Sequence, residues 1–169
     1  MQRISLTGPE SAGKSSLAAQ LAAHYSTTFV PEYARVYLEA HGPAYTLADL
    51  EAIARGQLAA EDAAAQITGF LFCDTDLLVI KIWAENAFGT CPAWVLAELE
   101  KPRYALTLLL APDLPWAPDP LREHPDPAQR WHFYELYRAE LVSRGWPFVE
   151  ISGPPAVRLA QARAACGKL

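Results

Sequence analysis

The sequence contains few cysteines and no long hydrophobic run. Its three cysteines, Cys73, Cys91 and Cys166, are far apart and show no Cys-x-x-Cys spacing. An odd number of cysteines without a disulfide framework predicts reduced thiols that pack in the fold or lie on its surface. The longest apolar runs, such as residues 105–111, are far too short to cross a bilayer, and no signal-peptide pattern opens the chain. We therefore expect a soluble, cytoplasmic protein without a membrane partner.

The sequence also lacks an excess of positive charge. Lysine and arginine together number 14 against 19 aspartates and glutamates, so the formal net charge is −5. This balance argues against a surface that neutralises nucleic-acid phosphates, and we expect no nucleic-acid partner. No internal repeat, low-complexity tract or interdomain linker is visible, and 169 residues suffice to bury a core. We expect residues 1–169 to form a single domain.

Short apolar runs alternate with helical segments, which is the pattern of an α/β domain with a parallel sheet. Leu17 and Leu21 lie four residues apart on one helical face, and Thr46 with Asp49 would cap a later helix. The pattern predicts a five-stranded, mainly parallel sheet flanked by helices. The expected strands are residues 3–7, 28–30, 69–73, 104–111 and 147–151. The expected helices are residues 14–25, 47–66, 75–87, 92–100, 127–144 and 154–165.

A glycine-rich loop follows the first expected strand. Residues 8–15 read Gly-Pro-Glu-Ser-Ala-Gly-Lys-Ser and match the Walker A pattern completely, so the sequence predicts a P-loop NTPase fold. The glycines let successive backbone N–H groups converge on phosphate oxygens, and the helix N-terminus adds a partial positive charge. Lys14 would reach the β- and γ-phosphates, and the Ser15 hydroxyl would bind Mg²⁺. The residues expected to hold the nucleotide are Gly8, Glu10, Ser11, Ala12, Gly13, Lys14, Ser15 and Ser16.

A P-loop site also needs a carboxylate at the end of a neighbouring strand. Residues 69–74 form an apolar run that ends in Asp74, and Asp76 follows two residues later. We expect this pair to complete the site, with Asp74 and Ser15 as metal ligands and Asp74 as a catalytic group. The alternative is that either aspartate only caps the helix that follows. Which of the two faces the metal stays open.

Several classes of P-loop protein lack their signals here. The guanine-reading Asn-Lys-x-Asp sequence is absent, and the short chain leaves little room for the features of motor and AAA-type ATPases. A compact kinase remains, and such an enzyme needs an acceptor site near its second strand. Glu32 leaves that strand and could accept the proton of an acceptor hydroxyl, with Arg35 on the same helical face. The alternative is a surface ion pair of little energetic value.

Proline is dense between residues 112 and 127, which forbids a regular helix or an interior strand. The segment follows the longest expected strand, where ligands gather in open α/β sheets. It is either a rigid surface loop or a lid over a ligand, and we favour a lid of about residues 112–130. Arg122 and Arg130 are the expected phosphate-covering cations, since guanidinium groups bind phosphate bidentately. Other side chains that favour the lid are Asp113, Trp116 and Asp119.

Four motifs stand in order along the chain. They are Gly-Pro-Glu-Ser-Ala-Gly-Lys-Ser at 8–15, Val-Pro-Glu-Tyr-Ala-Arg at 30–35, Phe-Cys-Asp-Thr-Asp at 72–76, and Asp-Leu-Pro-Trp-x-x-Asp-x-Leu-Arg at 113–122. This combination resembles the ribosylnicotinamide kinase domain of the NadR family. The resemblance implies that ATP, with Mg²⁺, phosphorylates the 5′-hydroxyl of nicotinamide riboside to give nicotinamide mononucleotide. By position, the resemblance implies that Lys14 and Ser15 bind ATP and Mg²⁺ and that Glu32, Tyr33 and Arg35 line the riboside site. It also implies that Asp74 and Asp76 complete the metal and acceptor region and that Arg122 and Arg130 belong to the lid.

The sequence departs from the family in two respects. Larger members also carry an adenylyltransferase domain and sometimes a DNA-binding helix-turn-helix, and neither fits in this chain. An aromatic residue that often precedes the Glu-Tyr pair is replaced by Pro31. A cationic nicotinamide ring still favours an aromatic face, and Trp116 is the first candidate ahead of Tyr33, Tyr37 and Trp83. The alternatives are another nucleoside or deoxynucleoside kinase, or a regulatory ATPase without a small acceptor.

Overall fold

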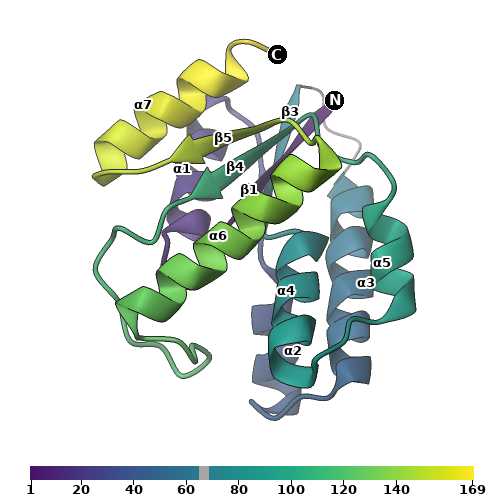
Figure 1. Ribbon diagram of the computed structural model, residues 1–169. Coiled ribbons are helices and arrows are strands. Elements are labelled where there is room, and N and C mark those ends of the chain that lie inside the picture. Colours follow the sequence, from purple (N-terminus) through teal and green to yellow (C-terminus); the bar gives the residue numbers. More distant parts are fainter. Residues whose placement is uncertain (65–68) are drawn as a thin grey trace.

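The computed structural model describes residues 1–64 and 69–169, and these form an α/β fold around a parallel sheet (Figure 1). The sheet order in this part of the chain is β2-β3-β1-β4-β5, and every strand pair is parallel. The predicted fold class is therefore confirmed, with a sheet that is wholly parallel. The strands are β1 (Gln2–Thr7), β2 (Phe29–Val30), β3 (Phe70–Asp74), β4 (Leu106–Leu110) and β5 (Phe148–Ile151).

Helices connect the strands, and six of them differ from the predicted ranges mainly at their ends. The remaining helix, α2 (Tyr33–His41), is absent from the predicted ranges, although a short helix was expected where Arg35 shares a face with Glu32. The predicted helix 75–87 begins two residues late because Asp76 is its N-cap and therefore lies outside it. Residues 65 and 66, the predicted end of another helix, lie outside the described residues. The helices are α1 (Lys14–His24), α2 (Tyr33–His41), α3 (Leu47–Ala63), α4 (Leu77–Phe88), α5 (Ala93–Leu99), α6 (Pro127–Arg144) and α7 (Pro155–Cys166).

Local sequence signals account for two of these helix starts. At α3, the Thr46 hydroxyl accepts a hydrogen bond from the Asp49 N–H (3.3 Å), and Asp49 Oδ2 accepts one from the Thr46 N–H (2.8 Å). This is the reciprocal capping box that the sequence predicted. At α6, Asp126 caps the helix through the Ala128 N–H, and Pro127 stands at the first position, where its missing N–H costs nothing.

The sheet divides the core into two layers, because successive side chains of a strand point to opposite faces. Ile4 and Leu6 of β1 and Phe72 of β3 pack against α1 and α7. Leu109 of β4 points the other way and joins the larger cluster formed with α2 to α6. Figure 1 shows α7 and α1 on one side of the sheet and α3 to α6 on the other. No helix in residues 1–64 or 69–169 is both long and apolar enough to cross a membrane.

The carboxyl ends of the parallel strands meet at one edge of the sheet. Four stretches of the chain lie at this edge: the loop after β1, the start of α2, the end of β3 and the proline-rich segment after β4. Open parallel sheets bind their ligands outside this edge. The topology therefore brings together the four stretches in which the sequence predicted functional residues.

Candidate functional site

The P-loop, residues 8–13, joins β1 to α1 in the conformation that an anion requires. Gly8 has φ 137°, and a Cβ there would lie 2.6 Å from the Leu110 carbonyl oxygen, so only glycine fits. Gly13, the N-cap residue of α1, has a left-handed backbone conformation with φ 83°. No side chain in the described residues caps the first turn of α1, so its N–H groups stay open. The Lys14 ammonium donates to the carbonyl oxygens of Gly8 and Pro9, each at 2.9 Å. The open amides and the lysine together favour a phosphate group.

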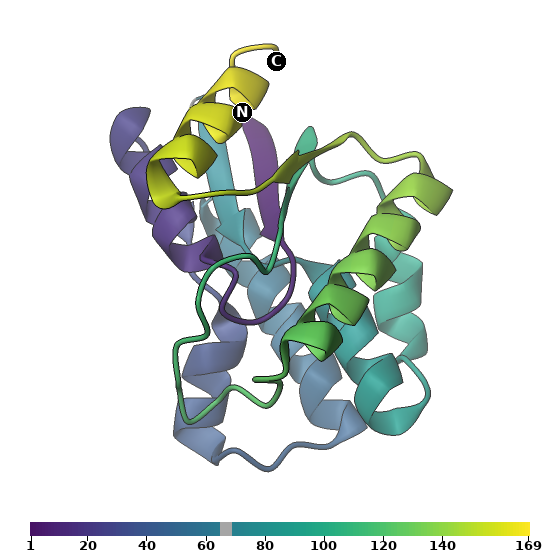
Figure 2. The same cartoon turned by 60° about the vertical axis from the view of Figure 1, so that its left-hand side comes forward.

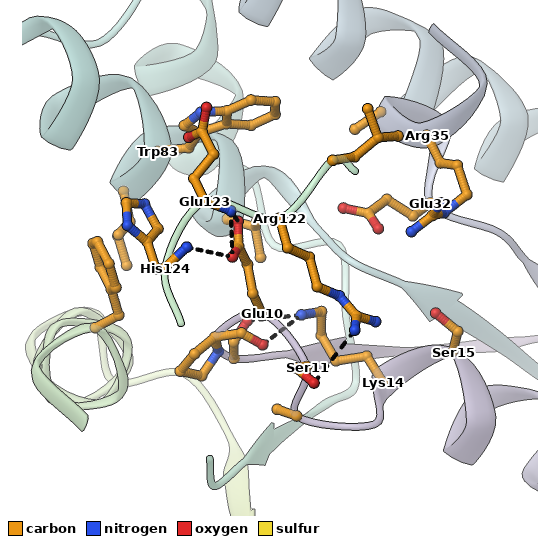
Figure 3. Close-up of a pocket in the computed structure, with 18 of the residues that line it drawn as sticks. Glu10, Ser11, Lys14, Ser15, Glu32, Arg35, Trp83, Arg122, Glu123 and His124 are labelled. Atoms are coloured by element: carbon orange, nitrogen blue, oxygen red, sulfur yellow. Dashed lines mark hydrogen bonds between the residues drawn. The ribbon is translucent and has the colours of Figure 1, made fainter. Parts of the chain in front are cut away.

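A cavity of about 240 Å³ extends from the P-loop between α2, α4, α6 and the proline-rich segment after β4 (residues 111–126). Its polar end carries the predicted residues Lys14, Ser15, Glu32 and Arg35, and Arg122 reaches it from the proline-rich segment (Figure 3). Its other end is aromatic and apolar. The side chains of that end are Tyr45, Val79, Ile82, Trp83, Phe133 and Tyr137, with Asn86, Glu123 and His124 as polar neighbours.

Two carboxylates lie near Lys14: Glu32 lines the cavity, and Asp74 is buried beside it without lining it. Burial raises the pKa of Glu32, and the negative charge of Asp74 adds to the effect, while Lys14 and Arg35 oppose it. Burial likewise raises the pKa of Asp74, against the hydrogen bond of the Ser15 hydroxyl and the charge of Lys14. A carboxylate with a raised pKa accepts a proton more readily than a free one, so Glu32 is suited to base chemistry.

The residues fit a hard cation at the end of β3. Asp74 is buried, and its Oδ1 has no hydrogen-bond partner within residues 1–64 and 69–169. Buried polar atoms are normally paired, so an orphaned oxygen calls for a ligand. A carboxylate oxygen with the nearby Ser15 hydroxyl is an oxygen donor set of the kind that Mg²⁺ takes with its waters.

Asp76 has a different environment from Asp74. Its Oδ1 accepts hydrogen bonds from the N–H groups of Leu78 (3.0 Å) and Val79 (3.3 Å) and from the Thr7 hydroxyl (3.3 Å). Asp76 is buried and, like Asp74, does not line the cavity. Its Oδ1 therefore caps α4, as the capping alternative requires, while its Oδ2, like Asp74 Oδ1, has no hydrogen-bond partner within the described residues. A direct contact of Asp76 with substrate in the cavity has no support in this geometry.

The proline-rich segment lies against the P-loop and α2, as Figure 2 shows for the green trace beside the purple loop. The Glu10 carboxylate accepts hydrogen bonds from the N–H groups of Glu123 (3.0 Å) and His124 (3.1 Å). On α2, Arg35 donates to Asp119 at 3.0 Å. The predicted range 112–130 overlaps α6, which begins at Pro127. The segment thus covers one side of the cavity, as the lid hypothesis requires.

The two predicted phosphate-covering arginines lie in different places. Arg122 lines the cavity and donates to the Ser11 hydroxyl (3.4 Å) and to the Ala117 carbonyl. Arg130 is 3% exposed and donates to backbone carbonyls of the P-loop, so it lies behind the loop rather than over a phosphate. The expectation for Arg130 is corrected: it comes from the first turn of α6, which packs on the far side of the loop.

Tyr33 and Trp116, both predicted substrate contacts, do not line the cavity. The Tyr33 ring occupies the space above Gly56 of α3, where a Cβ would approach it to 2.1 Å. The Trp116 ring lies 5.8 Å from the Arg122 guanidinium and 5.7 Å from that of Arg130. Among the candidate aromatics, Trp83 is the one that lines the cavity, in edge contact with Tyr45 at 4.7 Å between ring centroids.

Sequence reasoning missed most of the aromatic end. Tyr45, Asn86 and Phe133 carry no motif, and their spacing resembles that of ordinary core residues. Arg158 of α7 was also missed, although it is 2% exposed and reaches the P-loop. A lone arginine inside a helical sequence gives no signal of its partner, because the partner is 146 residues away in the chain.

The chain is similar to known proteins in both sequence and fold. A family profile described as AAA domain matches residues 3–158. The chain belongs to that family. It is also 30% identical over 156 residues to the trifunctional NAD biosynthesis/regulator protein NadR of Escherichia coli K12, and 29% identical to that of Salmonella typhimurium LT2. Each match covers 89% of the chain but 38% of the relative. The resemblance to NadR is therefore confirmed, over less than half of the relatives' length.

Solved structures agree on the fold. NadR in complex with NAD and AMP-PNP superposes with a TM-score of 0.78 at 23% identity, over 99% of this chain and 49% of that one. NadR in complex with NR gives 0.74 at 22% identity, with 51% of its length covered. Deoxyadenosine kinase from M. mycoides with bound dATP gives 0.60 at 12% identity, over 99% of this chain and all of the kinase. At these identities the likeness establishes the fold alone.

The description of the matched family bears on one exclusion made from the sequence. The chain length had argued against AAA-type ATPases, and the matched family carries that description over most of the chain. Its structural neighbours nevertheless include NadR and a deoxynucleoside kinase. The family description therefore leaves the choice between an ATPase and a kinase to the chemistry of the site.

Proposed function

We propose that this protein is a kinase that transfers the γ-phosphate of ATP to the 5′-hydroxyl of nicotinamide riboside. The observation that carries the proposal is that one continuous cavity runs from the P-loop past Glu32 to an aromatic end. A regulatory ATPase has no need of an acceptor pocket beside the γ-phosphate position. The 30% identity to NadR supports nicotinamide riboside as the acceptor.

The P-loop amides and Lys14 would bind the ATP phosphates. Ser15 and Asp74 would hold Mg²⁺, which would supply positive charge to neutralise the charge that develops on the phosphates. Arg122 faces the same region from the proline-rich segment and would stabilise the charge on the transferred group. The donor half of the reaction thus depends on positioning and electrostatics rather than on covalent chemistry.

Glu32 is the proposed base of the acceptor half. The 5′-oxygen forms the new bond to the γ-phosphorus, the bond from that phosphorus to the β,γ-bridging oxygen breaks, and ADP leaves with its electron pair. The hydroxyl proton passes to the Glu32 carboxylate, whose pKa is raised by burial. Asp74 is the alternative base, since it lies in the same charged group. Arg35 would orient the ribose beside Glu32.

The aromatic end supports a flat, cationic ring. Trp83 and Tyr45 offer aromatic faces, and the Glu123 carboxylate accepts a hydrogen bond from the Tyr45 hydroxyl at 3.0 Å. A pyridinium ring gains about 0.5–2 kcal/mol from such a face. We propose Trp83 as the ring-binding residue in place of Trp116, whose ring lies between two arginines outside the cavity.

A deoxynucleoside kinase is the second candidate, because deoxyadenosine kinase shares the fold over its entire length. The test measures ADP release by the full chain with ATP and Mg²⁺, alone and with nicotinamide riboside, deoxyadenosine or deoxycytidine. Lys14→Met is the inactive control, and Lys168→Met, at an exposed position, is its matched surface variant. Stimulation by nicotinamide riboside alone is the expected result. Stimulation by the deoxynucleosides would move the assignment to the second candidate, and release that ignores every acceptor would favour an ATPase.

A further inference from the structure

Three consecutive carbonyl groups of the P-loop face two buried arginines. Arg130 of α6 donates to the Glu10 oxygen (3.3 Å) through Nε and to the Ser11 oxygen (3.2 Å) through a terminal nitrogen. Arg158 of α7 donates to the next oxygen, that of Ala12, at 2.8 Å. Both arginines come from the C-terminal third of the chain, more than 100 residues from the loop. Together they contact the peptide carbonyl groups of Glu10, Ser11 and Ala12.

The remaining donors of these guanidinium groups anchor them to other elements. Arg130 also donates to the Leu114 carbonyl (3.2 Å), at the start of the proline-rich segment. Arg158 donates to the carbonyls of Ala111 (2.9 Å) and Gly153 (2.6 Å) and pairs with Asp113. Each arginine therefore fixes the loop relative to the end of β4 and the helix that carries it.

The direction of a peptide carbonyl determines the direction of the amide that follows it. Within one planar peptide unit the C=O and N–H groups point in opposite directions. Carbonyls of Glu10, Ser11 and Ala12 that point back toward the arginines leave the N–H groups of residues 11–13 pointing away from them, toward the cavity that these residues line. Converging amides of this kind are what binds a phosphate.

Charge reinforces this geometry. Arg130 forms no ion pair within the described residues, and three carbonyl oxygens and the Trp116 ring surround its guanidinium. Burial of a charge is costly unless polar groups meet it, and here the carbonyl oxygens of Glu10, Ser11 and Leu114 do so. A buried cation directly behind the amides adds to the attraction for an anion in front of them.

We propose that Arg130 and Arg158 are positioning residues that hold the P-loop in its phosphate-binding conformation before nucleotide arrives. The inference rests on the proposed function only in requiring that the loop binds phosphate, and it makes no use of the acceptor. Preorganised amides need no rearrangement when the phosphate binds, so losing either arginine weakens phosphate binding first. Sequence reasoning had assigned Arg130 to the opposite side of the phosphate.

The test measures binding of ADP and of inorganic tripolyphosphate to the full chain by calorimetry, well below the melting temperature. Tripolyphosphate has no base or ribose and therefore reports on the loop alone. In Arg130→Met and Arg158→Met we expect both dissociation constants to rise about 10- to 100-fold, because displaced amides no longer converge. Arg138→Met on α6 and Arg163→Met on α7, both exposed, are the matched controls and should bind like the wild type.

A second pair of variants keeps the test decisive if the methionine variants fail to fold. Arg130→Lys and Arg158→Lys retain the charge but cannot span several carbonyls, and we expect intermediate losses of tripolyphosphate affinity. Folded variants with a lower melting temperature and unchanged affinity for both ligands would overturn the proposal and leave a structural role. A different result would contradict the proposed function: ADP release by the wild type that does not change when nicotinamide riboside is added, while tripolyphosphate still binds.

Discussion

The two ends of the cavity are built in different ways. The phosphate end consists mainly of one short stretch of chain whose backbone amides would bind phosphate together with the side chains of Lys14 and Ser15, and whose conformation requires glycine at positions 8 and 13. The aromatic end gathers side chains from α4, α6, the loop before α3 and the proline-rich segment. The conformation of the loop depends on its glycines and on the arginines that contact its carbonyl groups, whereas the aromatic end changes with each side chain that lines it. In the proposed reaction the phosphate end would bind the donor and the aromatic end would select the acceptor.

The point where the two ends meet should be the most sensitive to substitution. Glu32→Gln keeps the size of the side chain but removes the proton acceptor, and we expect kcat to fall about 100- to 1000-fold with little change in ATP affinity. Because burial raises the pKa of Glu32, the acid limb of the wild-type rate should lie above the ordinary glutamate value of 4.5 and vanish in the variant. Initial rates across pH measure both effects. Glu39→Gln, exposed on the same α2 helix, is the control, and a rate near wild type for Glu32→Gln would leave Asp74 as the base.

A buried carboxylate outside the cavity should affect stability and not rate. Burial raises the pKa of Glu61 to about 7, although hydrogen bonds from Tyr104 (2.9 Å) and Gln57 (3.4 Å) oppose it. A raised folded-state pKa means that the native state holds the proton, so this stabilisation is present below pH 4.5 and is lost as the pH rises through 7. Between pH 5 and pH 8 the wild type should lose on the order of 3 kcal/mol relative to Glu61→Gln.

Urea unfolding at several pH values measures this difference, with kcat as a parallel readout. Glu51→Gln on the same α3 helix serves as the control, because Glu51 forms a partly exposed pair with Arg55. Identical pH dependence in wild type and Glu61→Gln would contradict the assignment. A large loss of kcat in Glu61→Gln would break the separation between the cavity and the rest of the core.

The aromatic end should control acceptor affinity alone. Trp83→Leu keeps an apolar side chain but removes the ring face, and we expect the KM for nicotinamide riboside to rise about tenfold, with the KM for ATP unchanged. Trp94→Leu is the matched control, since Trp94 packs on Arg55 outside the cavity. Steady-state kinetics with each substrate varied in turn distinguish the two. An equal rise in both KM values would mean that the ends are not independent.

The smallest effect is expected where the proline-rich segment meets α2. Arg35 and Asp119 form a 3.0 Å ion pair, but the arginine side chain is 43% exposed. Exposed pairs contribute about 0–1 kcal/mol, so Asp119→Asn should change kcat/KM by no more than about threefold. Glu39→Gln, which removes a second ion-pair partner of Arg35, is the comparison. A larger loss in Asp119→Asn would indicate that this pair, rather than the Glu10 contacts, keeps the segment over the cavity.

Much of the fold could be predicted from the sequence because its signals are local. The capping box at Thr46 and the Asp126–Pro127 start of α6 involve residues within a few positions of one another. Strand ends were less accurate: the strand predicted from 104 to 111 spans Leu106–Leu110, although the N–H groups of Ala105 and Ala111 still donate to the Arg3 and Ile151 carbonyls of the neighbouring strands. An apolar run thus marks a strand better than it marks the last paired residue.

The sequence by itself determined the P-loop, since the spacing of its glycines and lysine dictates a backbone conformation over eight residues. It also pointed to Glu32 and Asp74 at the ends of β2 and β3, and to Arg122 in the segment after β4, as polar groups near one edge of the sheet. Only the tertiary structure decided that Arg130 and Arg158 lie behind the loop, that Tyr33 packs against Gly56, and that Trp83 rather than Trp116 faces the cavity. The direction of a side chain depends on what packs against it, and for these residues the neighbours come from distant parts of the chain.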